Sequence, residues 1–134
     1  EELMVPNGVY VLVKRFTAKE ERRRVVATVF RPEGSLAGFA TVGFENHLNY
    51  FHHRGGGLDD RLAEGLAVYL NSTVVDSYFR QFSGHTQVNA TDLRGLRYPS
   101  RGQLYKLAES AAAGTRDQEA IDSAVEAMIQ TSRR

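Results

Sequence analysis

Two polar stretches of this chain carry side chains suited to a ligand that is negatively charged and rich in hydrogen-bonding groups. The first is basic and comprises Lys14, Arg15, Lys19, Arg22, Arg23 and Arg24. Lysine and arginine side chains on a hairpin loop can follow phosphates or enter a groove of a nucleic acid. The second is polar and comprises Ser83, His85, Gln87 and Asn89. Asparagine and glutamine can form two hydrogen bonds with adenine, whereas serine and histidine can reach phosphates or base edges.

Both stretches also have a structural explanation, which stays open. A charge run is usually a solvated surface loop, and residues 16–23 mix basic residues with glutamates. Residues 89–92 are typical of a turn and cap before a short helix. That second explanation is compatible with ligand contact. Lys14 and Arg15 project from opposite faces of a strand, so at least one of them can meet a partner.

A third polar group precedes a run of glycines and comprises Asn46, His47, Asn49, His52, His53 and Arg54. The asparagines, the first histidine and the arginine could contact a nucleic acid or brace an exposed face of the fold. Histidines five and six residues apart on a strand do not converge on one ion, and no cysteine exists to complete a tetrahedral set, so we expect no metal site. The glycines at 55–57 lack the lysine and the serine or threonine of a phosphate-binding loop, and we expect a flexible linker there.

The apolar pattern predicts strands first and helices afterwards. Runs rich in β-branched and aromatic residues predict four strands, at residues 9–15, 24–31, 39–44 and 47–52. Helical spacing from residue 58 onward predicts four to five helices, two of them preceded by capping boxes at 100–103 and 115–118. This order predicts an α+β domain with a mainly antiparallel sheet of about four strands followed by the helices.

The helix pair at residues 65–84 is expected to form the core that positions these groups. One apolar face is formed by Leu62, Leu66, Tyr69 and Leu70, and the next by Val74, Val75, Tyr78, Phe79 and Phe82. Asn71 and Ser72 should separate the two helices, because their side chains bond free backbone donors better than they continue a helix. Asp76 and Arg80 are four residues apart and can pair on the outer face. Arg80 is also a candidate nucleic-acid contact.

Composition indicates one soluble domain. The 134 residues suffice for a buried core, with a sheet-rich, basic part at 1–57 and a helical part at 58–134. The net charge of +1 decides little, because clustering of charge governs nucleic-acid binding. The absence of cysteine excludes disulfides, and no apolar run approaches the roughly 20 residues of a membrane span. We expect a cytoplasmic protein without membrane contact and, since a strand follows closely on Glu1, a fragment of a longer protein.

Three segments together resemble the C-terminal part of adenine-specific DNA methyltransferases of restriction–modification systems, the type in which a target-recognition domain follows the catalytic domain. The segments are YVLVKRFTAKEERRRVVATVF at 10–30, ENHLNYFH at 45–52 and LNSTVVDSYFRQFSGHTQVNATDLRGLRYP at 70–99. In this pattern a lysine–arginine strand leads to an asparagine–histidine strand and then to paired helices. The resemblance covers residues 9–107.

What the resemblance implies is a target-recognition domain that grips double-stranded DNA beside a methyltransferase domain located upstream in the same chain. The full-length protein would be a site-specific, adenine-specific DNA methyltransferase that uses S-adenosylmethionine. Residues 1–134 contain neither the Asn/Asp-Pro-Pro-aromatic motif that receives the base nor a glycine-rich turn for the methyl donor. We therefore expect no catalytic residue and no cofactor in them. The alternative is a protein-interaction or scaffold domain without DNA binding, in which exposed apolar parts of the last two helices contact a partner chain.

Overall fold

The computed structural model describes residues 2–15, 23–32, 41–45, 48–82, 88–111 and 117–132. Its strands are β1 (Glu2–Pro6), β2 (Tyr10–Lys14), β3 (Ala27–Phe30), β4 (Thr41–Glu45) and β5 (Leu48–Phe51). Its helices are α1 (Asp60–Leu70), α2 (Thr73–Phe82), α3 (Ala90–Arg94), α4 (Arg101–Ala111) and α5 (Gln118–Ser132). The strands precede the helices, which confirms the α+β class, and β1 is a strand that the sequence did not predict.

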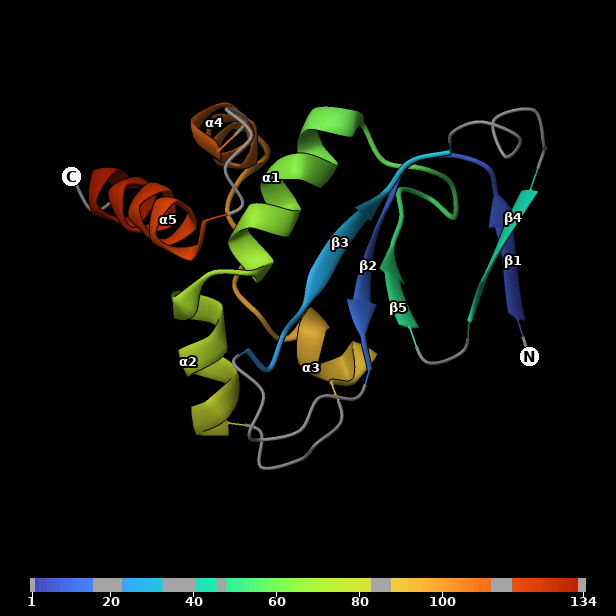
Figure 1. Ribbon diagram of the computed structural model, residues 1–134, viewed down its shortest axis with the longest axis horizontal. Helices are drawn as coiled ribbons and strands as arrows, with labels where there is room; N and C mark the ends of the chain where they lie inside the picture. Colours follow the sequence, from blue (N-terminus) through green and yellow to red (C-terminus); the bar gives the residue numbers. More distant parts are fainter. Residues whose placement is uncertain are drawn as a thin grey trace.

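The strands form two separate antiparallel sheets (Figure 1). In the larger sheet β2 is central and pairs with β3 on one side and β5 on the other, with Val11 opposite both Val29 and Phe51. In the smaller sheet β1 pairs with β4. Because antiparallel neighbours run in opposite directions, the end of β2 lies beside the starts of β3 and β5.

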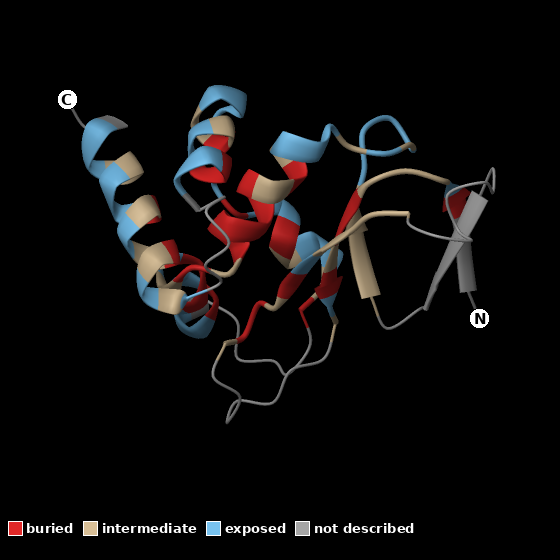
Figure 2. Ribbon diagram, turned by 45° about the horizontal axis from the view of Figure 1, so that its top comes forward, coloured by how far each residue is buried: buried red, intermediate tan, exposed pale blue. Residues whose placement is uncertain are grey.

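Successive side chains of β2 enter two different apolar clusters. Val11 and Val13 belong to the main core, which the helices complete, whereas Tyr10 packs with Val5 in a smaller cluster. Helix α1 is buried throughout residues 65–70 because it passes between the sheet and α4. Figure 2 shows this concentration of buried residues around α1. The helices therefore cover one face of the larger sheet.

The central helix pair breaks at Asn71 and Ser72, as predicted. Helix α1 begins after the N-cap Asp59, whose carboxylate accepts a hydrogen bond from the Leu62 N–H at 3.1 Å. At the other end of α1, the Asn71 amide donates to the Ala27 carbonyl at 2.9 Å and accepts from the Ala27 N–H at 2.8 Å. The break thus attaches the end of α1 to β3.

Helix α2 buries a narrower face than its spacing predicted. Val75 and Phe79 are buried as expected, but Val74 and Tyr78 are 37% and 40% exposed. Among the described residues, α2 packs against α1 and α5. The two exposed residues therefore lie outside the core.

The two predicted capping boxes have different outcomes. At the start of α4, the Gln103 N–H donates to the Ser100 hydroxyl at 3.2 Å, and the Ser100 N–H donates to the Gln103 side-chain oxygen at 2.8 Å, which confirms the first box. In the second, Gln118 is the first residue of α5 and its amide donates to the Asn71 carbonyl at 2.9 Å. Thr115 lies outside the described residues. The side chain of Gln118 therefore joins α5 to the helix junction.

The glycine run after β5 makes a tight turn instead of a flexible linker. Arg54 and Gly55 have positive φ angles of 51° and 82°, as both central residues of one type of two-residue hairpin turn require. The flanking His53 and Gly56 exchange two backbone hydrogen bonds of 2.9 Å. The structure thus has a hydrogen-bonded turn where the sequence predicted a flexible linker, because Gly55 supplies the backbone conformation that the turn requires.

Candidate nucleic-acid interface

Three polar segments meet at the end of the larger sheet where β2 stops and β5 starts. The N–H of Val88 donates to the carbonyl of Arg15 at 2.5 Å. The side-chain amide of Asn49 donates to the carbonyl of Val88 at 2.7 Å. Lys14, which precedes Arg15, is exposed. These contacts bring the predicted residues Lys14, Arg15, Asn49 and Asn89 to one end of the molecule.

A buried carboxylate gathers the next basic residues at the same end. Asp76 of α2 accepts a hydrogen bond from the backbone N–H of Arg24 at 2.7 Å and from Nε of Arg80 at 2.9 Å. A guanidinium nitrogen of Arg23 lies 3.8 Å from the same carboxylate. The predicted Asp76–Arg80 pair is thus confirmed, but its carboxylate is buried. Arg24 is only 2% exposed, whereas the side chain of Arg80 is 38% exposed.

Helix α5 braces this cluster through Asp122. Thr73 donates to the Asp122 carboxylate from its backbone N–H at 2.8 Å and from its hydroxyl at 2.6 Å, and Gln118 donates at 3.1 Å. Burial alone would raise the pKa of Asp122, but the hydrogen bonds from Thr73 and Gln118 and the charge of Arg23 hold that pKa below its ordinary value. The carboxylate is therefore ionised at neutral pH and fixes the first turn of α2.

Arg54 lies at the opposite end of the larger sheet. It sits in the turn after β5, and the chain from this turn returns to the start of β2, where the Leu58 N–H donates to the Val9 carbonyl at 2.7 Å. Val9 precedes β2 and Arg15 follows it. The length of the strand therefore separates Arg54 from Lys14 and Arg15.

Several predicted contacts fall outside the described residues: Lys19, Arg22, Asn46, His47, Ser83, His85 and Gln87. Their contacts with DNA stay predictions. Within the described ranges, no three histidine, cysteine or acidic side chains are grouped so that they could hold a metal ion. None of the helices in the same ranges has the length and apolar content to cross a membrane.

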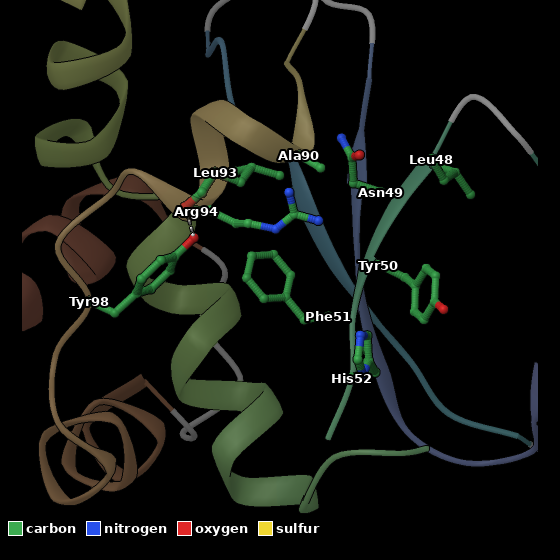
Figure 3. Close-up of a pocket in the computed structure, with 9 residues that line it drawn as sticks. All are labelled: Leu48, Asn49, Tyr50, Phe51, His52, Ala90, Leu93, Arg94 and Tyr98. Carbon is green, nitrogen blue, oxygen red and sulfur yellow. Dashed lines mark hydrogen bonds between the residues drawn. The ribbon is translucent and has the colours of Figure 1, made fainter. Parts of the chain in front are cut away.

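A groove of about 440 Å³ lies between β5 and α3. Its lining residues are Leu48, Asn49, Tyr50, Phe51, His52, Ala90, Leu93, Arg94 and Tyr98. Figure 3 shows Asn49 and Phe51 pointing from β5 toward α3, and Arg94 pointing back from α3 across the groove. The groove begins at the strand end that carries Asn49, so it adjoins the meeting point of the polar segments.

Arg94 and Tyr98 are site residues that sequence reasoning missed. The Tyr98 hydroxyl donates to the Leu93 carbonyl at 2.6 Å, and its ring meets the Phe51 ring edge to face, with centroids 6.0 Å apart and planes at 72°. Burial, with a smaller contribution from Tyr69, raises the pKa of Tyr98. Its hydroxyl therefore remains a donor at neutral pH. The sequence signals for this region were the neighbouring polar run and the motif at 70–99, and neither singled out these two side chains as ligand contacts.

This end of the molecule has the chemistry to engage an anionic polymer. Lys14 and Arg80 are exposed cations that can meet phosphates. Asn49 and Arg94 offer the amide and guanidinium groups that match the edges of bases. The positively charged side chains and the hydrogen-bonding side chains thus lie next to each other at this end of the molecule.

Two curated proteins are similar to nearly the whole chain. Type II methyltransferase M.PstI of Providencia stuartii is 56% identical over 128 residues, which are 96% of this chain and 25% of that protein. Type II methyltransferase M.BsuBI of Bacillus subtilis is 48% identical over 135 residues, which are 99% of this chain and 26% of that protein. No protein-family model matches the chain, and no solved structure matches it significantly. The chain spans about a quarter of the length of these curated relatives, and it is homologous to that part of the two Type II methyltransferases.

Proposed function

We propose that this chain is the DNA target-recognition part of an adenine-specific DNA methyltransferase of a restriction–modification system. Its similarity to a quarter of two Type II methyltransferases supports the proposal, as do the sequence motifs at 10–30, 45–52 and 70–99. The observation that carries the proposal is the hydrogen bond from Val88 to Arg15, because it joins the basic strand end to the residues that lead into α3. A duplex lying across this end would meet both.

We assign phosphate contacts to Lys14, Arg15 and Arg80, whose side chains are exposed or half-buried. Arg24 is 2% exposed and its backbone is bound to Asp76, so we assign it a structural part in ordering the start of β3. Exposed cations such as Lys14, Arg15 and Arg80 would displace counterions from the DNA, so binding should weaken as the salt concentration rises. Reading of base edges falls to the side chains of the groove and of the polar segment before α3.

We assign methyl transfer and the binding of S-adenosylmethionine to an upstream domain of the same full-length protein. The sequence of this chain contains no motif for either step. Its part is to hold the double-stranded DNA in register for that domain. The full-length enzyme would work in the cytoplasm, where its DNA substrate is.

A salt titration of duplex binding tests the proposal. The double variant Lys14→Gln/Arg15→Gln removes two charges from the proposed interface, and Arg54→Gln is its control because it removes a charge from the opposite end of the sheet. We expect log Kobs of the unaltered chain for a pool of random duplexes to fall linearly with log salt. The double variant should bind more weakly to all sequences and lower the steepness of that line by about one per lost phosphate contact. The control should match the unaltered chain.

Two results would contradict the proposal. One is the absence of duplex binding by the unaltered chain at about 50 mM salt, where phosphate contacts are strong. The other is a fall in log Kobs for Arg54→Gln of half that in the double variant or more, because each removed charge would then count alike and net charge, not the proposed interface, would govern binding.

A protein-interaction function is the second candidate, and a groove between α4 and α5 favours it. This groove, of about 250 Å³, is lined by Gln103, Lys106, Leu107, Ser110, Ala124, Ala127, Met128 and Thr131. A small apolar groove of this kind can receive a side chain of a partner protein. In this function Ala127→Glu would abolish association with a second copy or with the rest of the full-length protein, whereas the charge variants at Lys14 and Arg15 would not. Sedimentation velocity at matched concentrations separates the two.

A further inference from the structure

We propose that the groove between β5 and α3 holds a single nucleobase that lies outside the helical stack of a bound strand. The inference rests on the proposed DNA-binding function and adds the ligand of one site. It does not follow from target recognition alone, since a duplex can be read along its grooves with every base stacked.

The groove has a suitable size and position for one base. Its volume of about 440 Å³ falls within the roughly 300–1,000 Å³ that small-molecule sites occupy. Leu48 lines it and pairs in register with Lys14. The side chains of Leu48 and Lys14 share the face of the sheet that points away from α3 (Figure 3), and Arg15, one residue further, alternates to the face of the groove. A phosphate held at Arg15 would therefore place the sugar and base of the same strand beside the groove.

The apolar side of the groove suits a flat aromatic ligand. Phe51 and Tyr98 hold one another edge to face at a centroid distance of 6.0 Å, and the hydrogen bond from Tyr98 to the Leu93 carbonyl, at 2.6 Å, fixes the second ring further. Rings that are already fixed lose little conformational freedom when a ligand binds. Stacking on aromatic side chains is available to every base, because each base has a π face.

The polar side supplies an acceptor and several donors. Asn49 gives its N–H to the Val88 carbonyl at 2.7 Å, which fixes the orientation of the amide and keeps its oxygen as the acceptor. Arg94 extends across the groove toward β5 (Figure 3) and carries donors only. Base edges present donors and acceptors next to each other. The pair Asn49 and Arg94 is therefore complementary to a base edge.

A phosphate alone matches the groove less well. Phe51, Ala90, Leu93 and Tyr98 form an apolar side of the groove, and Arg94 is the only lysine or arginine among the lining residues. A phosphate bound to Arg94 would leave the Phe51 and Tyr98 rings without a ligand contact. A base uses both the charged side and the aromatic side of the groove.

Titration of the chain with each of the four deoxynucleoside monophosphates, followed by NMR, tests the inference. We expect the signals of the Asn49 side-chain amide, Phe51 and Arg94 to shift with all four nucleotides, whereas deoxyribose 5-phosphate leaves them in place. Arg94→Gln and Phe51→Leu should each weaken nucleotide binding by about fivefold or more, since stacking and charge both contribute. Arg97→Gln is the matched control, because Arg97 is an exposed arginine next to the groove that does not line it. Arg94 is exposed, so its replacement tests the site even where Phe51→Leu loosens the fold.

Equal shifts from the sugar phosphate would overturn the inference, because the groove would then be an anion site. Unshifted groove signals in the presence of nucleotides would overturn it as well. If duplex binding and its salt dependence persist in that case, the proposed function stands and only the base site falls. If nucleotides bind while duplexes do not, the base site stands and the proposed function falls.

Discussion

Adding one methyl group at Gly65 should destabilise the fold, because α1 and α4 cross there in backbone contact. A Cβ on Gly65 would lie 1.9 Å from the carbonyl oxygen of Leu104, 2.6 Å from its carbonyl carbon and 3.1 Å from its Cα. All three are backbone atoms, so no side-chain rotation relieves the clash. Gly65→Ala therefore forces the two helices apart by roughly 1 Å or bends one of them.

Two opposing effects set the size of the change. Alanine favours the helix over glycine by about 1 kcal/mol. Overpacking of a core costs about 1–3 kcal/mol and occasionally more, and a clash between backbones belongs at the upper end because Leu66, Leu107 and their neighbours along the crossing all lose contacts. We expect a net loss of about 2 kcal/mol or more in the free energy of unfolding, equivalent to a fall in Tm of roughly 5–10 °C.

Urea unfolding followed by circular dichroism measures this difference. Gly102→Ala is the matched control, because Gly102 lies in the first turn of α4 and a Cβ there meets no atom within 4 Å. The control should be neutral or up to about 1 kcal/mol more stable. A free energy of unfolding for Gly65→Ala equal to that of the control would refute the close crossing of α1 and α4.

Three further substitutions test the contacts that hold the helices in place. Asn71→Ala leaves the N–H and carbonyl of Ala27 without their side-chain partner and should cost about 1–3 kcal/mol in urea unfolding. Ser100→Ala removes the cap of α4 and should cost about 1 kcal/mol, visible as a lower Tm. Asp122→Asn should destabilise the chain at pH 7, since a carboxylate with a lowered pKa contributes stability above its unfolded-state pKa of about 4 and loses it as the pH falls through the folded-state pKa. The unfolding curves of Asp122→Asn and the unaltered chain should therefore converge in acid; a constant gap at all pH values would contradict this explanation.

Local chemistry explains which parts of the fold the sequence predicted. The break at Asn71 and the capping box at Ser100 depend on side chains that bond backbone groups within a turn. Strand β1 (Glu2–Pro6) was missed because its partner β4 (Thr41–Glu45) lies far along the chain, so no hairpin turn in the sequence indicates the pairing. Pairing of distant strands is set by the whole fold and leaves little trace in a short window of sequence.

The structure brings the flanks of the two predicted polar segments together, and the contacts of their residues with DNA stay predictions. The flanks of the two polar segments meet at Arg15 and Val88, as a common surface requires. Arg24 stood in a charge run that normally indicates a solvated loop, yet it is buried, and its backbone N–H donates to the buried carboxylate of Asp76. Arg94 lines the groove because α3 lies beside β5, and that arrangement is not visible in the sequence around Arg94. Hydrophobic periodicity predicts which residues share one face of a helix or strand. It does not predict which other helix or strand packs against that face.

The junction between α1 and α2 also bears on the solubility of the chain. β3 is an outer strand of its sheet, and a free strand edge is a template for self-association. The Asn71 amide presents to Ala27 the same donor and acceptor as the peptide group of another strand. A single side chain at the end of a helix thus blocks the position where a second molecule would add to the sheet.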